Sequence, residues 1–393
     1  MPSIRELTRR DGPRRRPRTA FVLSGGGNLG AIQVGMLRAL AERDIVPDVV
    51  LGCSVGALNG AGYAADPTLD GVARLEQHWR ETTSHTLMPS SRIPSAVQLL
   101  RKGASLHSNE GLRSGLEALL GEESRIEDLE LPFQCVAADV EDAVERWFDH
   151  GDLVESILAS AALPAVYPPV VIDGRRYIDG GVIDNVPIAR AVELGCRTIY
   201  VLHVGPHGRP DVEIKRPLDG ALLAYWIARN SRFAHDLAAL PAKVEAIVLP
   251  PGQRPDIKYD DFGRTDELVD QGYGNSSRFL DERDAEAGER RRGADLLAPI
   301  ERLSLSTRWR SSRQAERVAA SPEGAIVTGA GDAEVPDEPP SDGDTRPDGD
   351  TGPGDDTGPG GGRGPGDGTA TSDGSSPVAE GAEVGQRDDS RSS

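Results

Sequence analysis

The chain has 393 residues, of which 63 are acidic and 44 basic, so its formal net charge is −19. Much of this charge is terminal, because residues 311–393 hold 18 acidic and 6 basic residues. The low isoelectric point therefore says little about a substrate, and we expect no nucleic-acid partner. Three cysteines, an odd number in apolar surroundings, indicate reduced core thiols and a cytoplasmic setting rather than a disulfide framework.

Short apolar runs alternate with segments of helical periodicity along the chain. The expected strands are 20–23, 48–51, 133–138, 144–148, 170–172, 176–178, 198–204 and 244–249. The expected helices are 29–43, a segment that follows residue 54, 69–82, 110–120, 152–161 and 187–194. Strands that alternate with helices predict an α/β fold with three layers, α/β/α, around a mostly parallel central sheet.

Composition divides the chain into four parts. Residues 1–18 hold seven arginines and predict a basic disordered arm, either simply solvated or attracted to anionic lipid. Residues 19–283 predict one catalytic domain, and residues 284–310 a charged peripheral helix. Residues 311–393 are rich in Gly, Pro, Asp, Ser and Thr. Such a segment buries too little apolar surface to offset its ordering entropy, so we predict a disordered acidic tail.

Residues 83–108 are less regular than their neighbours. Within them Ile93, Val97 and Leu100 recur at helical spacing beside basic residues. One interpretation is a lid that meets lipid at the periphery of a membrane. The other is an ordinary amphipathic helix on the core.

Two glycine-rich turns each follow a predicted strand and precede a predicted helix. The first, residues 25–30, reads GGGNLG, and the second, residues 52–56, reads GCSVG. The second turn is a G-x-S-x-G elbow, which presents the Ser54 hydroxyl at a tight strand-to-helix turn. Gly52 and Gly56 leave the room that such a turn requires.

Backbone amides of the first turn form a candidate oxyanion cradle. Gly26 and Gly27 offer N–H groups, and Val55 adds one at the start of a helix, where the dipole favours an anion. A serine nucleophile beside such a cradle predicts acyl transfer.

The first turn also fits a different function. The pattern Gly25-x-Gly27-x-x-Gly30 matches a dinucleotide fingerprint, so a NAD(P)-binding oxidoreductase is an alternative. That alternative expects an acidic residue at the end of the next strand, where this chain has Cys53-Ser54. The sequence therefore favours a hydrolase. A non-catalytic lipid-binding module with a vestigial site is a third hypothesis.

The nucleophile needs a base, and the residues leave two solutions open. His203 or His207, near the end of a strand, would complete a Ser–His–Asp triad. Asp179, which precedes Gly180 and Gly181, would instead take the serine proton directly if partial burial raises its pKa. Chemistry alone does not choose between them.

Four ordered blocks resemble the patatin-like phospholipase family. They are residues 25–30, residues 52–56, the run ASAALPAVYPP at 159–169, and Asp179-Gly180-Gly181. The resemblance implies a catalytic dyad of Ser54 and Asp179 without a catalytic histidine. It implies an oxyanion hole at Gly25, Gly26 and Gly27, with further motif glycines at Gly30, Gly52, Gly56, Gly180 and Gly181.

The resemblance also implies a three-layer patatin-like fold and hydrolysis of lipid esters with no metal or cofactor. One position departs from the family, because Leu29 stands where Arg or Lys is frequent. A neutral ester or a lysophospholipid is therefore a more plausible substrate than a highly charged lipid. We expect a cytoplasmic enzyme, with peripheral membrane contact as an option.

Overall fold

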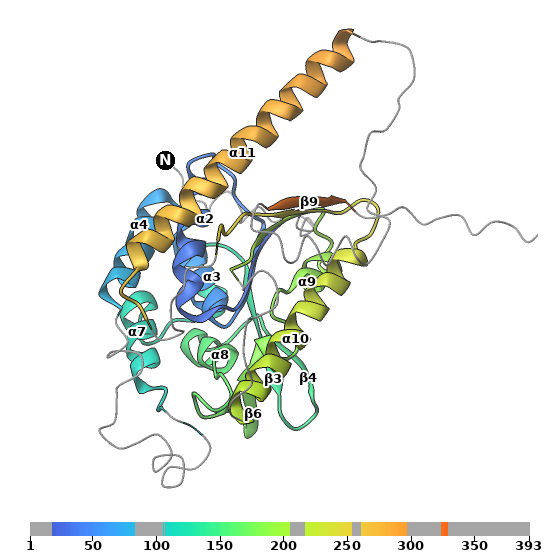
Figure 1. Ribbon diagram of the computed structural model, residues 1–393. Coiled ribbons are helices and arrows are strands. Elements are labelled where there is room, and N and C mark those ends of the chain that lie inside the picture. The colour runs from blue at the N-terminus through green and yellow to red at the C-terminus, as the bar shows by residue number, and fades with distance from the viewer. Residues whose placement is uncertain are drawn as a thin grey trace, which may run out of the picture. The chain divides into compact units, whose positions relative to one another are not determined.

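The computed structural model describes residues 18–82, 105, 107–204, 217–253, 261–296 and 324–328 (Figure 1). The predicted basic arm lies outside the described residues apart from Arg18. So do most of the predicted lid at 83–108 and nearly all of the predicted tail.

A nine-stranded sheet organises the described chain. Its centre is parallel and runs in the order β3 (Phe133–Asp139), β2 (Val49–Cys53), β1 (Thr19–Leu23), β7 (Thr198–Leu202), β8 (Glu245–Val248). Antiparallel strands flank this centre: β4 (Val144–Phe148), β5 (Val170–Ile172) and β6 (Arg175–Asp179) on the β3 side, and β9 (Ala325–Thr328) beside β8. The parallel centre confirms the prediction, and the flanks make the sheet mixed.

Successive strand side chains enter two separate apolar cores, as the pleat requires. Phe21 and Leu23 of β1 face one core, whereas Ala20 and Val22 face the other. The helices that cover the first core are α2 (Gly30–Ala41), α3 (Val55–Ala65), α4 (Leu69–Glu81), α7 (Glu110–Leu120), α8 (Leu153–Ser160) and α11 (Thr265–Leu296). The helices on the second core are α9 (Ile188–Glu193) and α10 (Pro217–Ala238). Helices on both faces give the expected α/β/α layers (Figure 1).

Two elements of the structure do not follow the predicted domain boundaries. No break separates the domain from a peripheral helix at 283–284, because α11 runs unbroken from Thr265 to Leu296. The tail predicted from residue 311 contains β9, whose Val327 is buried against β8. The short run Ala-Ile-Val-Thr has β-forming residues, and pairing with an open sheet edge orders it. Helix α10 is an element that the sequence patterns did not predict.

Among the helices in the described residues, none combines the length and the apolar run needed to cross a bilayer.

Helices α2 and α11 approach so closely that backbone meets backbone. A Cβ added at Gly35 would overlap the Val269 carbonyl oxygen, and one added at Gly272 would overlap the Ile32 carbonyl oxygen. Glycine at both positions therefore sets the distance between the two helices.

Gly272→Ala is expected to lower the free energy of unfolding by about 1 to 3 kcal/mol, because the added methyl group overlaps the α2 backbone. The matched control is Gly274→Ala in the same helix, where an added Cβ meets nothing within 4 Å. That variant should keep or gain stability, by up to about 1 kcal/mol. Urea denaturation measures both, and equal effects would contradict this packing.

Candidate active site

A strained turn between β2 and α3 presents the candidate nucleophile. Ser54 has φ 54° and ψ −123°, a conformation that non-glycine residues rarely adopt. A Cβ at Gly52 would lie 2.5 Å from the Gly56 carbonyl oxygen, and a Cβ at Gly56 would overlap the Leu23 carbonyl. The two motif glycines therefore allow the elbow to close tightly against β1.

The glycine loop after β1 lies directly beside Ser54. A Cβ at Gly25 would be 3.1 Å from the Ser54 Cβ and 2.6 Å from Asn185 Oδ1. A Cβ at Gly26 would be 2.5 Å from Val204 Cγ2. The loop then forms the 3₁₀ turn η1 (Gly27–Leu29), which leads into α2. Close packing on both sides explains why the loop contains no side chains at these positions.

Four backbone amides were predicted to line an oxyanion hole, and they differ in availability. The Gly25 amide donates to the Asn185 carbonyl oxygen at 3.2 Å and is thereby engaged. The amides of Gly26, Gly27 and Val55 have no acceptor among the residues that the structure describes. Unpaired backbone donors beside a nucleophile are the arrangement that an oxyanion hole requires.

Ser160, at the end of α8, links the elbow to strand β3 through hydrogen bonds. Its Oγ accepts a hydrogen bond from the Ser54 amide at 2.9 Å and donates to the Val136 carbonyl of β3 at 2.6 Å. Ser160 is fully buried. One residue of the 159–169 block therefore has a structural role, which is to bind the backbone of the elbow at Ser54.

Sheet register brings Asp179 to the elbow. Cys53 pairs with Val136 on β3, and the next residue, Ala137, pairs with Asp179 at the end of β6. The Ser54 side chain lies close enough to the Asp179 carboxyl to lower its pKa, and Asp179 Oδ1 accepts a hydrogen bond from the Gly181 amide at 2.7 Å. The structure therefore brings the two predicted dyad residues together.

Burial controls the protonation of Asp179, which is 2% exposed. Loss of solvent is the largest influence and raises the pKa of this carboxyl above its ordinary value. The Ser54 side chain, the hydrogen bond from Gly181 and the charge of Arg229 oppose that rise. A carboxylate with a raised pKa accepts a proton more readily than a solvated one.

Of the two histidine alternatives, the structure describes only His203. His203 is buried, and its ring packs against Phe233 of α10 at 4.7 Å between centroids. His207 lies outside the described residues.

Cys53 lies next to the nucleophile but is a poor substitute for it. Its side chain is fully buried, with Sγ 4.0 Å from Asp179 Oδ1. Burial, with the nearby carboxylates of Asp179 and Asp184, raises the pKa of the Cys53 thiol well above its usual range. The thiol is therefore neutral at ordinary pH and unreactive.

A chain of buried side chains supports the glycine loop, and the sequence analysis missed it. Trp79 Nε1 donates to Asn59 Oδ1 at 2.8 Å, and Asn59 Nδ2 donates to Gln33 Oε1 at 2.8 Å. Gln33 Nε2 then donates to the carbonyls of Ser24 and Leu202, at 2.8 and 2.9 Å. Two amide side chains on otherwise apolar helix faces were the available signal.

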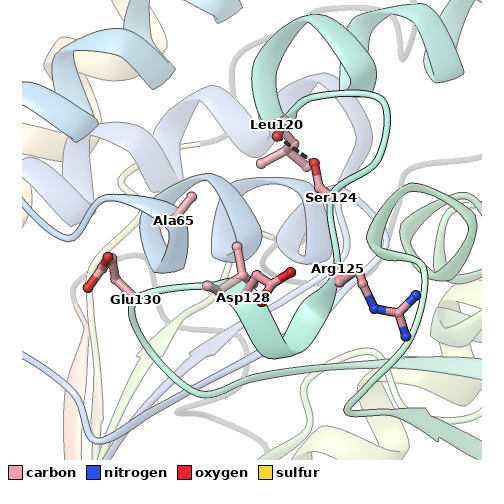
Figure 2. A pocket seen from close by; sticks show the side chains of 7 residues that line it. Ala65, Leu120, Ser124, Arg125, Asp128 and Glu130 are labelled. Atoms are coloured by element: carbon pink, nitrogen blue, oxygen red, sulfur yellow. Dashed lines mark hydrogen bonds between the residues drawn. The ribbon is translucent and has the colours of Figure 1, made fainter. Parts of the chain in front are cut away.

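A separate cavity of about 250 Å³ lies at the far end of α3, where it is lined by Ala65, Leu120, Ser124, Arg125, Asp128, Leu129 and Glu130 (Figure 2). The Ser124 hydroxyl is engaged by the Leu120 and Gly121 carbonyls. The Arg125 guanidinium pairs with Glu127. This cavity contains none of the predicted site residues and no serine paired with an acid.

Within the described ranges, no group of three or more His, Cys, Asp or Glu side chains is arranged to hold a metal ion.

The family model described as Patatin-like phospholipase matches residues 21–192, a range that contains the glycine loop, the elbow and Asp179. The chain carries a patatin-like phospholipase domain. The match includes the glycine loop and favours a hydrolase over the dinucleotide-binding alternative.

Curated relatives of the patatin-like domain are long proteins. Patatin-like phospholipase domain-containing protein 7 of Rattus norvegicus is 30% identical over 210 residues, which cover 53% of this chain and 15% of the relative. Patatin-like phospholipase domain-containing protein 6 of Homo sapiens is 27% identical over 317 residues, which cover 71% of this chain and 22% of the relative. Lysophospholipase nte1 of Aspergillus terreus is 28% identical over 283 residues, which cover 66% of this chain and 18% of the relative. The chain thus spans about a fifth of the length of these relatives.

Two solved structures resemble the patatin-like domain at low identity. VipD from Legionella pneumophila has a TM-score of 0.35 at 13% identity, covering 68% of this chain and 67% of that one. Human GIVD cytosolic phospholipase A2 has a TM-score of 0.33 at 12% identity, and the match covers 70% of this chain and 60% of that one.

Ser160→Ala is expected to lower the free energy of unfolding by about 1 to 3 kcal/mol, because it leaves the Ser54 amide and the Val136 carbonyl without their buried partner. The control is Ser156→Ala, one turn earlier in α8. There Oγ bonds only the Asp152 carbonyl, which keeps the Ser156 amide, so the cost should stay below about 1 kcal/mol. Thermal or urea unfolding of both variants checks the difference. A smaller loss for Ser160→Ala than for Ser156→Ala would contradict the role given to Ser160.

Proposed function

We propose that the patatin-like domain is a serine acyl hydrolase that cleaves lipid esters through a dyad of Ser54 and Asp179. The observation that carries the proposal is the position of the Ser54 side chain beside the buried Asp179 carboxyl, next to backbone amides that have no acceptor among the described residues. A nucleophile, a base and an oxyanion cradle within one site are the parts that acyl transfer needs.

In the first half-reaction, Ser54 Oγ attacks the ester carbonyl while its proton moves to Asp179. The amides of Gly26, Gly27 and Val55 stabilise the oxyanion, each such donor being typically worth about 3 to 4 kcal/mol. The tetrahedral intermediate then expels the alcohol, which takes the proton from Asp179. An acyl-enzyme on Ser54 remains.

In the second half-reaction, water attacks the acyl-enzyme and gives its proton to Asp179. Collapse of the second tetrahedral intermediate breaks the bond to Ser54 Oγ, which recovers the proton from Asp179. The fatty acid leaves, and the dyad returns to its starting state. Charge alternates on Asp179 in both halves, so a buried site that tolerates its neutral form suits the reaction.

The substrate class proposed for the domain is a lysophospholipid or another ester with one acyl chain. Two observations support it. Relatives of the domain carry the name lysophospholipase. Leu29 of the glycine loop is 7% exposed and packs in the first core, so this position offers no cation to a charged lipid.

Ser54→Ala should reduce hydrolysis of a p-nitrophenyl ester and of lysophosphatidylcholine by about 10³-fold or more, and Asp179→Asn nearly as much, because either change removes half of the dyad. His203→Ala is the control and should retain most activity. Hydrolysis rates and labelling by a fluorophosphonate probe measure the outcome. A loss with His203→Ala as deep as with Ser54→Ala would restore the triad. A folded wild type that resists the probe would favour a non-catalytic lipid-binding module.

The pH dependence of kcat/KM should have an acid limb above the ordinary aspartate range, whose centre is about 3.9. Only ionised Asp179 accepts the serine proton, so activity falls as pH falls through its pKa. Burial raises that pKa, which moves the limb upward. A pH profile with the p-nitrophenyl ester measures it, and activity that stays constant down to about pH 4 would contradict the assignment.

A further inference from the structure

Two side chains of α10, outside the matched residues 21–192, reach the dyad. The Tyr225 hydroxyl lowers the pKa of the Asp179 carboxyl and lies beside it, since a Cβ added at Gly181 would meet both the hydroxyl and Asp179 Oδ1. A Cβ added at Gly181 would overlap that hydroxyl, so the second glycine after Asp179 leaves the space that Tyr225 occupies. The carboxyl therefore accepts a hydrogen bond from the Gly181 amide and has the Ser54 and Tyr225 hydroxyls as further neighbours.

Arg229 lies one helical turn further along α10 and joins the base to the glycine loop. Its Nη2 donates to the Gly25 carbonyl oxygen at 3.5 Å. Its guanidinium carbon is 5.4 Å from the centroid of the Tyr225 ring. Among the described residues, no carboxylate lies within ion-pair distance of Arg229, so its charge acts on the dyad instead.

We propose that Tyr225 and Arg229 are positioning residues for the Asp179 base, holding its carboxylate at the Ser54 hydroxyl and keeping it ionised inside the protein. This inference rests on the proposed function. Neither side chain needs to touch the reacting ester, because Tyr225 acts through Asp179 and Arg229 acts through Asp179 and the Gly25 carbonyl.

The physical need for such a pair follows from burial. A carboxylate deprived of water becomes protonated unless donors and a positive charge replace the lost solvation. A protonated Asp179 cannot accept the Ser54 proton. Tyr225 supplies a hydroxyl and Arg229 supplies the charge, and each lowers the pKa that burial raises. Tyr225 keeps its own proton, because burial raises the pKa of its phenol well above the usual value.

Other ionisable groups near Asp179 could also contribute to a pH profile, and their titration must be distinguished from that of Asp179. Cys53, on β2, is neutral at ordinary pH. Asp184 is 1% exposed, and burial raises its pKa to about 8, so it titrates in the range of an assay. Its charged neighbours are Glu145 on β4 and Arg232 and Asp236 on α10.

Tyr225→Phe keeps the ring and removes the hydroxyl. We expect kcat to fall at least tenfold at pH 7 while KM changes less than about twofold, because the pair acts on the base rather than on substrate binding. The acid limb of kcat/KM should move up by about one pH unit, as loss of a hydroxyl beside a charged group implies. Arg229→Gln should give the same direction, and Arg229→Lys should recover part of the shift because it restores the charge.

The chain supplies a matched control away from the site. Tyr273 on α11 donates to Glu42 at 2.7 Å, and the Arg38 guanidinium lies 4.4 Å above its ring. This is the same combination of arginine, phenol and carboxylate. Tyr273→Phe and Arg38→Gln should leave the pH profile unchanged. Asp184→Asn should leave the acid limb in place as well, which assigns the limb to Asp179.

The outcomes separate this inference from the proposed function. A limb that moves by less than about 0.3 unit in Tyr225→Phe and Arg229→Gln overturns the inference, provided that Ser54→Ala is inactive. A raised KM with unchanged kcat also overturns it, because the pair would then bind substrate. An active Ser54→Ala variant instead overturns the proposed function. Thermal unfolding shows whether each variant is folded, and if Tyr225→Phe is not, Arg229→Lys measured against Arg229→Gln decides.

Discussion

The approach of the Ser54 hydroxyl to the buried Asp179 carboxyl is the interaction on which the rest of the site depends. It joins residues that are far apart in the sequence, and adjacent strands of one sheet supply the alignment. A buried carboxylate is costly unless donors surround it. A buried carboxyl at the end of β6, beside the Ser54 hydroxyl, is what the proposed proton transfer requires.

The geometry of the elbow is unfavourable by itself and is maintained by its surroundings. Ser54 has a positive φ, which costs of order 1 to 3 kcal/mol when a residue is held in a sparsely populated conformation. Three features oppose relaxation: the absence of side chains at Gly52 and Gly56, and the Ser160 hydroxyl that accepts from the Ser54 amide. These contacts with the surrounding sheet and helices keep the Ser54 hydroxyl in position.

Much of the fold and the centre of the site could be predicted from the sequence, because both rest on local patterns. Apolar runs predicted the strands around Phe21 and Val50 to within a few residues, and glycines marked both turns. Tyr225 and Arg229 could not be found in this way, since no short motif surrounds them and their role comes only from the packing of α10. The sequence likewise gives no sign that the Gly25 amide, a predicted oxyanion donor, instead donates to the Asn185 carbonyl oxygen. Neither tertiary contact leaves a trace in spacing or composition.

Strand β9 shows a different limit of composition. A segment that is polar and glycine-rich on average still contains four residues, Ala325–Thr328, that pair with β8 and bury Val327. This strand occupies the outer hydrogen-bonding groups of β8. A shortened chain that ends before residue 325 would leave those groups open, and an unprotected edge recruits strands from other molecules. Loss of colloidal solubility, rather than loss of chemistry, would be the first sign that the truncation had gone too far.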